Sequence, residues 1–101
     1  MNDLEAEYAA LLDARVARGE LFGYQFEAVK LFLAEKTWYT PDFLVLLADG
    51  LLEFHEVKGY WQEDARVKFK VVAEQFAWAR FVAVTRRPKK AGGGWNEERM
   101  K

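Results

Sequence analysis

The 101-residue chain contains no cysteine and a single histidine, His55. The lack of cysteine excludes disulfides, thiolate metal sites and a cysteine nucleophile, and the single histidine excludes sites that need two imidazoles. Metal chemistry would therefore fall to carboxylates. No apolar run approaches the roughly 20 residues that span a bilayer. The N-terminal segment is acidic and amphipathic, unlike a secretory signal, so we expect a cytoplasmic protein without membrane contact.

Hydrophobic residues make up 51% of the chain and aromatic residues 16%, enough for one compact core, so we expect a single domain over residues 1–101. The net charge of -1 hides an asymmetry between the two parts of the chain. Residues 1–65 hold 5 Lys and Arg against 13 Asp and Glu, whereas residues 66–101 hold 10 against 3. A basic segment suits a polyanion such as nucleic acid, but it also fits an ordinary solvated surface.

The hydrophobic spacing predicts two helices and four strands. Residues 3–18 have helical periodicity with Gly19 as the cap, and a second helix starts near Glu63 or Asp64, with Phe69, Val72, Ala73 and Phe76 on one face. Strands are expected at 24–33, 42–47, 51–58 and 81–85, with a loop at 34–41. The basic, glycine-rich segment 86–101 is expected to break regular structure before Trp95 and to be frayed at its last residues. The core, about 3–85, has the order α-β-β-β-α-β. This is an α/β class fold, a four-stranded mixed sheet flanked by helices.

The most informative element is the hairpin at Asp49-Gly50. A three-residue loop, Ala48 to Gly50, gives a register in which paired residue numbers sum to 98, and Gly50 suits the left-handed loop position. In that register Asp42 lies opposite Glu56, with Lys58 on the same face of the sheet. Opposed like charges destabilise a hairpin, and a divalent cation would remove the repulsion. The alternative is a pair of strand-edge carboxylates exposed to water.

These residues suit phosphodiester hydrolysis. Asp42, Glu56 and the main-chain carbonyl of Val57 offer hard oxygen ligands for Mg²⁺, with Mn²⁺ as a substitute. The metal would activate a water molecule, and Lys58 would orient that water or stabilise the charge that develops on the phosphate. Glu5 lies within the apolar stripe of the first helix and is the candidate for a further ligand; Glu7 replaces it if the helix is rotated.

Pro41-Asp42, thirteen intervening residues and Glu56-Val57-Lys58 resemble the PD-(D/E)xK signature of the restriction-endonuclease-like nuclease superfamily, whose core order is α-β-β-β-α-β. The resemblance implies that Asp42, Glu56 and Glu5 bind Mg²⁺ and that Lys58 assists hydrolysis. The chain is most similar to small phage endonucleases, including those that resolve Holliday junctions. We therefore expect a structure-selective, phage-derived DNA endonuclease. The alternative is a catalytically silent module that binds nucleic acid or protein on the same fold.

Several further residues are candidates for contact with nucleic acid. Phosphate contacts are expected from Arg66, Lys68 and Lys70 of the second helix and from Arg86 and Arg87, followed by Lys89 and Lys90. Trp95 could stack on a base, although core packing is favoured, and Tyr60 and Trp61 either line the DNA cleft or cap the core. His55 falls on the opposite face from Asp42 and Glu56, so no catalytic role is expected.

Cutting both strands of a duplex suggests a homodimer, as in related junction resolvases. Candidate interfaces are the helix at 3–18 and the aromatic pair Trp38 and Tyr39, because a two-fold interface would place two sites for paired nicks.

Overall fold

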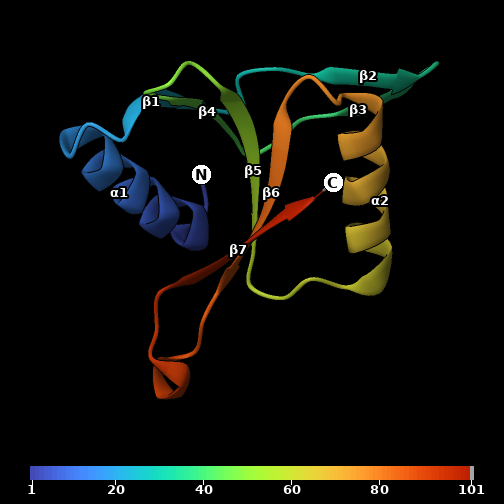
Figure 1. The fold of residues 1–101 in the computed structure, drawn as a ribbon. Helices are drawn as coiled ribbons and strands as arrows, with labels where there is room; N and C mark the ends of the chain where they lie inside the picture. Colours follow the sequence, from blue (N-terminus) through green and yellow to red (C-terminus); the bar gives the residue numbers. More distant parts are fainter. Residues whose placement is uncertain (101) are drawn as a thin grey trace.

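The computed structural model describes residues 1–100 and has three layers, a five-stranded mixed sheet with one helix on each face (Figure 1). The sheet order is β1-β4-β5-β6-β7, with β5 and β6 parallel and the other neighbours antiparallel. Its strands are β1 Leu21–Phe26, β4 Phe43–Leu47, β5 Leu52–Lys58, β6 Arg80–Arg86 and β7 Trp95–Met100. The fold is mixed α and β as predicted, but the sheet has five strands where we predicted four.

The helices α1 (Asp3–Ala17) and α2 (Glu63–Gln75) cover separate hydrophobic cores. Tyr8 and Leu12 of α1 pack on one face of the sheet, and Phe69 of α2 packs on the other. Because side chains alternate along a strand, β5 contributes to both cores, with Val57 on the α1 face and Phe54 on the α2 face. Within residues 1–100, no helix is long and apolar enough to cross a membrane.

Helix α1 begins with a capping box. The Glu5 N–H donates to the Asn2 side chain at 2.7 Å, and the Asn2 N–H donates to the Glu5 carboxylate at 2.8 Å. These bonds satisfy two N–H groups that the helix itself cannot. At the other end the chain leaves the helix after Arg18 through Gly19, whose φ is +79°. The predicted helix and its glycine cap are confirmed.

The β4–β5 hairpin has the predicted register. Phe43 pairs with His55 and Leu46 with Leu52, so paired residue numbers sum to 98, and the Leu47 N–H donates to the Leu51 carbonyl across the three-residue loop. Gly50 has φ +91°, a conformation that side chains disfavour. This register fixes which polar residues of the two strands share a face.

The single strand predicted over 24–33 is wrong. Strand β1 ends at Phe26, and Glu27 takes a positive φ of 48° that turns the chain out of the main sheet. The following residues form a separate two-stranded sheet, β2 (Leu31–Ala34) with β3 (Thr37–Tyr39), where we predicted a loop at 34–41. The apolar run is therefore divided between two sheets, and Leu31 packs in the core under α2.

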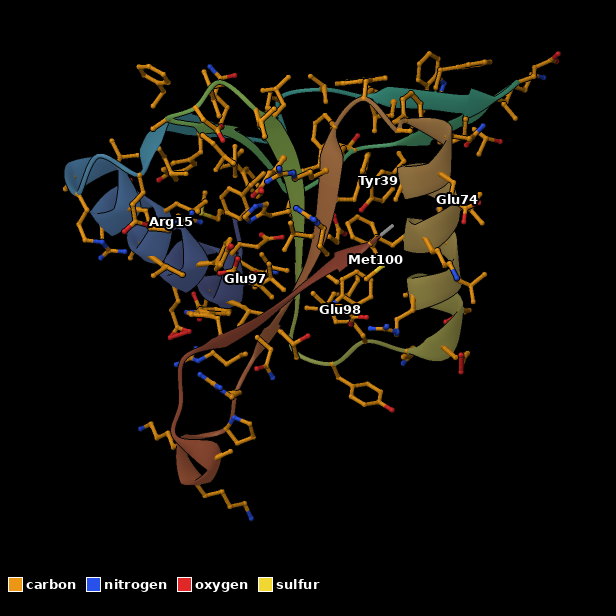
Figure 2. All side chains as sticks on the ribbon, in the orientation of Figure 1. Arg15, Tyr39, Glu74, Glu97, Glu98 and Met100 are labelled. Carbon is orange, nitrogen blue, oxygen red and sulfur yellow. The ribbon has the colours of Figure 1, made fainter. Side chains whose placement is uncertain are left out.

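The fraying predicted for the last residues is wrong as far as Met100, whereas the predicted break before Trp95 is confirmed. After β6 the chain forms a short 3₁₀ helix, η1 (Lys89–Ala91), and turns through Gly92, Gly93 and Gly94, all at positive φ. It returns as β7, antiparallel to β6. Glu97 of β7 points toward α1 and Glu98 toward α2 (Figure 2). The middle of β7 carries charged side chains, so the hydrophobic pattern does not predict a strand there. Such charged side chains are typical of an edge strand.

Candidate active site

Asp42 and Glu56 are held side by side by main-chain hydrogen bonds. The Asp42 N–H donates to Oε1 of Glu56 at 3.2 Å, and the Val57 N–H donates to Oδ2 of Asp42 at 2.8 Å. Both residues are only 9% exposed. In the described part of the chain, the second oxygen of each carboxylate accepts no hydrogen bond of normal geometry, although the Tyr39 hydroxyl lies near Glu56. The hairpin register therefore presents two anchored carboxylates, each with one oxygen left over.

Burial makes this pair costly to ionise. Burial raises the pKa of Asp42 to about 7, and the Glu56 carboxylate adds to the rise, while the Val57 N–H and Lys58 oppose it. The pKa of Glu56 is also raised by burial, although Tyr39, the Asp42 N–H and Lys58 favour its charged form. Two adjacent carboxylates with raised pKa values are a common feature of sites that bind a cation or handle protons.

Lys58 lies beside the carboxylates with its amine at the surface. Its Nζ is 3.7 Å from Oε2 of Glu56, the oxygen that accepts no main-chain bond, and its side chain is 39% exposed. The ammonium also lies 5.7 Å from the centre of the Trp61 ring. The structure thus brings together Asp42, Glu56 and Lys58, the three residues of the predicted motif.

Glu5 and Glu7, the predicted helical candidates, have other partners in the structure. Glu5 is half-buried near the pair and contributes to the raised pKa values of Asp42 and Glu56, but its carboxylate caps α1. Glu7 forms an ion pair with Arg86 at the surface. Across residues 1–100, no group of three or more acidic, histidine or cysteine side chains is arranged to hold a metal ion. The capping role of Glu5 was readable from the Asn2-x-x-Glu5 spacing.

A hollow of about 130 Å³ adjoins Glu56 and Lys58 on the α2 face. Tyr39, Trp61, Lys68 and Phe69 complete its lining, together with Ala65. Tyr39 lies between the sheet and α2 (Figure 2), and its hydroxyl is buried without a hydrogen-bond partner. Burial, and then the Glu56 charge, raise the pKa of Tyr39, so this hydroxyl stays protonated. The sequence offered Tyr39 only as a candidate dimer contact. Its side chain is half-buried and its hydroxyl faces the hollow, and the dimer contact stays a prediction.

The predicted nucleic-acid contacts divide into two groups. Lys68 lines the hollow, with Nζ 5.9 Å from the Tyr39 ring centre, and Lys70 is exposed on the same helix. The three arginines are engaged within the chain. Arg66 makes two 2.8 Å bonds to Glu98, Arg86 pairs with Glu7, and Arg87 donates to the Gly93 carbonyl at 2.9 Å.

The aromatic candidates also divide. Trp95 packs on the core, 5.1 Å from the Tyr8 ring centre, as favoured from the sequence. Trp61 donates its indole N–H to the Val84 carbonyl at 3.2 Å and lines the hollow, whereas Tyr60 is 77% exposed. A larger hollow of about 390 Å³ over β1 and β4 is lined mainly by apolar side chains such as Phe22 and Leu46, with no carboxylate or amine.

His55 belongs to a second polar cluster on the α1 face. It is fully buried, with Nδ1 2.6 Å from the Tyr8 hydroxyl and Nε2 2.8 Å from Oε1 of Glu53. Because an ionised carboxylate only accepts, Nε2 carries a proton toward Glu53, and Nδ1 shares a hydrogen bond with the Tyr8 hydroxyl. Arg80 reaches the other Glu53 oxygen at 3.5 Å. The predicted separation of His55 from the carboxylate pair is confirmed, but the sequence did not reveal this network.

Comparison with protein families, with curated proteins and with solved structures finds no match. The site itself consists of a buried carboxylate pair, a lysine at the surface and an adjoining hollow with aromatic walls. Such an arrangement can hold a hard divalent cation beside an anionic substrate.

Proposed function

We propose that this chain is a Mg²⁺-dependent DNA endonuclease, structure-selective and of phage origin, with Asp42, Glu56 and Lys58 at its active site. The observation that carries the proposal is the anchored, buried carboxylate pair with Lys58 3.7 Å from Glu56. A pair of merely structural carboxylates would be exposed or fully paired, because isolated buried charge is costly.

The residues present fit a hard divalent cation. One oxygen of each carboxylate is held by a main-chain N–H, which fixes both groups and leaves Oδ1 of Asp42 and Oε2 of Glu56 for a ligand. Oxygen ligands of this kind suit Mg²⁺ and Mn²⁺. The main chain of Val57 borders the pair. Glu5 would join only by giving up its cap on Asn2.

When bound, Mg²⁺ supplies a Lewis acid that polarises a phosphate oxygen and lowers the pKa of the attacking water. The chain supplies the rest. Asp42 and Glu56 would hold the cation, and the Lys58 ammonium, 39% exposed beside Glu56, would orient the water or stabilise the charge that grows on the phosphate. Tyr39, Trp61 and Phe69 shield the side of the site that faces α2.

The order of elements supports the same proposal. If the β2–β3 hairpin and β7 are treated as additions, the remaining elements run α1, β1, β4, β5, α2, β6, which is the α-β-β-β-α-β order of the restriction-endonuclease-like nucleases. The motif residues then fall at the start of the second core strand and the end of the third, as in that superfamily.

A homodimer would place two such sites for paired cuts in branched DNA. Trp38 is 49% exposed and packs on Phe32, so this aromatic pair and the outer face of α1 are the candidate contacts. The molar mass in solution, measured by light scattering, tests the dimer separately from the chemistry.

Cleavage assays test the activity. Purified protein is incubated with supercoiled plasmid and with a labelled four-way junction, in Mg²⁺, Mn²⁺ or EDTA. We expect metal-dependent cutting, with preference for the junction, and a loss on the order of 10³-fold in Asp42→Asn and in Lys58→Ala. Glu74→Gln and Lys30→Gln are matched controls, because both side chains are exposed and neither lines the hollow beside the motif.

Two results would overturn the proposal. One is a wild-type protein that cuts no form of DNA with either metal, which would favour the catalytically silent binding module. The other is cutting that persists at the wild-type rate in Asp42→Asn, which would point to a contaminating nuclease.

A further inference from the structure

The hollow beside the carboxylate pair is built from three parts of the chain that are remote in sequence. Tyr39 comes from β3, Trp61 from the segment after β5, and Lys68 and Phe69 from α2. The β2–β3 hairpin, which lies outside the main sheet, therefore supplies one wall. Figure 2 shows Tyr39 reaching into the space between the sheet and α2.

Two ammonium groups converge on this hollow. Lys58 lies over the Trp61 ring at 5.7 Å and Lys68 over the Tyr39 ring at 5.9 Å, so each amine is held by an aromatic face. The one carboxylate in the lining is Glu56, whose nearer oxygen is 3.7 Å from Lys58. Lys68 has no carboxylate partner among the described residues. The hollow thus carries a net positive charge that is not neutralised within the chain.

The Tyr39 hydroxyl adds a hydrogen-bond donor that lies near the Glu56 carboxylate but makes no hydrogen bond of normal geometry to it. Across residues 1–100 it is the one buried side-chain polar atom that lacks a partner. Buried polar groups are almost always paired, and an exception calls for a missing ligand or water. An acceptor atom in the hollow would complete the bond.

Size and chemistry narrow the class of ligand. At about 130 Å³ the hollow is well below the roughly 300 Å³ at which pockets for drug-sized molecules begin. A nucleobase with its sugar is too large, whereas a small oxyanion fits. Two amines and a hydroxyl donor are the groups that bind phosphate.

We propose that this hollow is a phosphate subsite, in which Lys68 and the Tyr39 hydroxyl bind a phosphate group of the nucleic-acid strand beside the carboxylate pair. The proposal rests on the proposed nuclease function and extends it, because it gives the β2–β3 hairpin a role in holding the substrate. Phosphate from a free anion and from a nucleic-acid strand share the same chemistry, and the two are separated by experiment.

The test uses the Trp61 indole N–H as the reporter, because it is fixed on Val84 and its ring lines the hollow. Its signal in a ¹H–¹⁵N spectrum is assigned by Trp61→Phe. Inorganic phosphate, thymidine 5′-monophosphate and a ten-nucleotide deoxyoligonucleotide are titrated in turn, each with EDTA and with Ca²⁺. We expect saturable shifts of this signal, with the oligonucleotide binding most tightly.

The variants are Tyr39→Phe, which removes one oxygen atom, and Lys68→Gln. Each should weaken oligonucleotide binding at least fivefold. The matched control is Lys30→Gln, because Lys30 also lies over an aromatic ring, Trp38 at 5.4 Å, but away from the hollow. Wild-type affinity in both hollow variants, or equal weakening in the control, would overturn the subsite.

The subsite and the nuclease can fail separately. If the plasmid is cut but Tyr39→Phe and Lys68→Gln cut and bind as the wild type does, the subsite falls and the nuclease stands. If the Trp61 signal titrates with the oligonucleotide but no DNA is cut, the subsite stands as part of a binding module. A response to inorganic phosphate without any response to the oligonucleotide would overturn the assignment to a nucleic-acid strand.

Discussion

Strand β5 carries a polar cluster on each of its faces, and the two clusters differ in how well they are satisfied. On the α1 face both nitrogens of His55 are bonded, one to Tyr8 and one to Glu53. On the α2 face one oxygen of Glu56 and one of its neighbour Asp42 accept no hydrogen bond of normal geometry. The first cluster is complete as part of the fold, whereas the second leaves carboxylate oxygens for the cation that we propose. For this reason we base the proposed function on the Asp42 and Glu56 pair and not on the His55 cluster.

Breaking the satisfied cluster should give the largest change in stability. His55→Ala leaves Tyr8 and Glu53 without their partner in a fully buried place and opens a cavity. We expect the free energy of unfolding to fall by about 3 to 5 kcal/mol. Urea denaturation followed by circular dichroism measures it, with Glu74→Gln as the control. A loss below about 1 kcal/mol would show that the network contributes little.

The unsatisfied cluster should respond to pH in the opposite way to ordinary surface carboxylates. The folded-state pKa of Asp42, about 7, lies above its usual 3.8, so the folded protein holds this proton more tightly than the unfolded chain does. Its contribution to stability is present below pH 4 and is lost as the pH rises through 7, up to about 4 kcal/mol. In EDTA, Asp42→Asn should therefore gain stability over the wild type as the pH rises from 5 to 8.

The quantity to measure is the difference in unfolding free energy between the wild type and Asp42→Asn, because the other carboxylates titrate equally in both proteins. Added Mg²⁺ should stabilise the wild type at pH 8 and leave Asp42→Asn nearly unchanged. A difference in unfolding free energy that stays flat from pH 5 to 8 would contradict the raised pKa.

Two single-atom deletions sharpen the comparison. Tyr8→Phe removes the hydroxyl that is hydrogen-bonded to His55 and should lower the free energy of unfolding by about 1 to 2 kcal/mol. Tyr39→Phe removes a buried hydroxyl that makes no hydrogen bond of normal geometry, so without divalent cation it should be neutral or stabilising by about 1 kcal/mol. Thermal unfolding of the two variants side by side decides the signs. Equal losses would mean that the Tyr39 hydroxyl is satisfied in solution.

What the sequence predicted well was local. The hairpin register follows from Gly50 and the alternation around it, and it places Asp42 beside Glu56 without knowledge of the rest of the fold. Both helices follow from their spacing of apolar residues. The three residues of the motif were therefore found by arguments that use a single hairpin.

What the sequence failed to predict depends on distant partners. Strand β7 carries few apolar residues, and its place in the sheet comes from β6 and from Trp95 packing on α1. Tyr39 reaches the site because Glu27 turns the chain out of the sheet and the hairpin folds back over α2. No local sequence pattern predicts that the β2–β3 hairpin folds back over α2, so the sequence did not predict the hollow.

The smallest change in the free energy of unfolding is expected for the exposed cation of each cluster. The two cations have similar surroundings. Arg80 lies 3.5 Å from Glu53 with its side chain 40% exposed, and Lys58 lies 3.7 Å from Glu56 with its side chain 39% exposed. Exposed pairs of this kind contribute little, so Arg80→Ala and Lys58→Ala should each change the free energy of unfolding by less than about 1 kcal/mol. Their effects on junction cleavage should differ completely, with activity lost in Lys58→Ala and kept in Arg80→Ala. The two cations have the same charge and similar exposure and distance to a glutamate, so a difference in activity between the variants reports the effect of the Asp42 and Glu56 pair. Equal activity in both variants would show that Lys58 takes no part in the reaction.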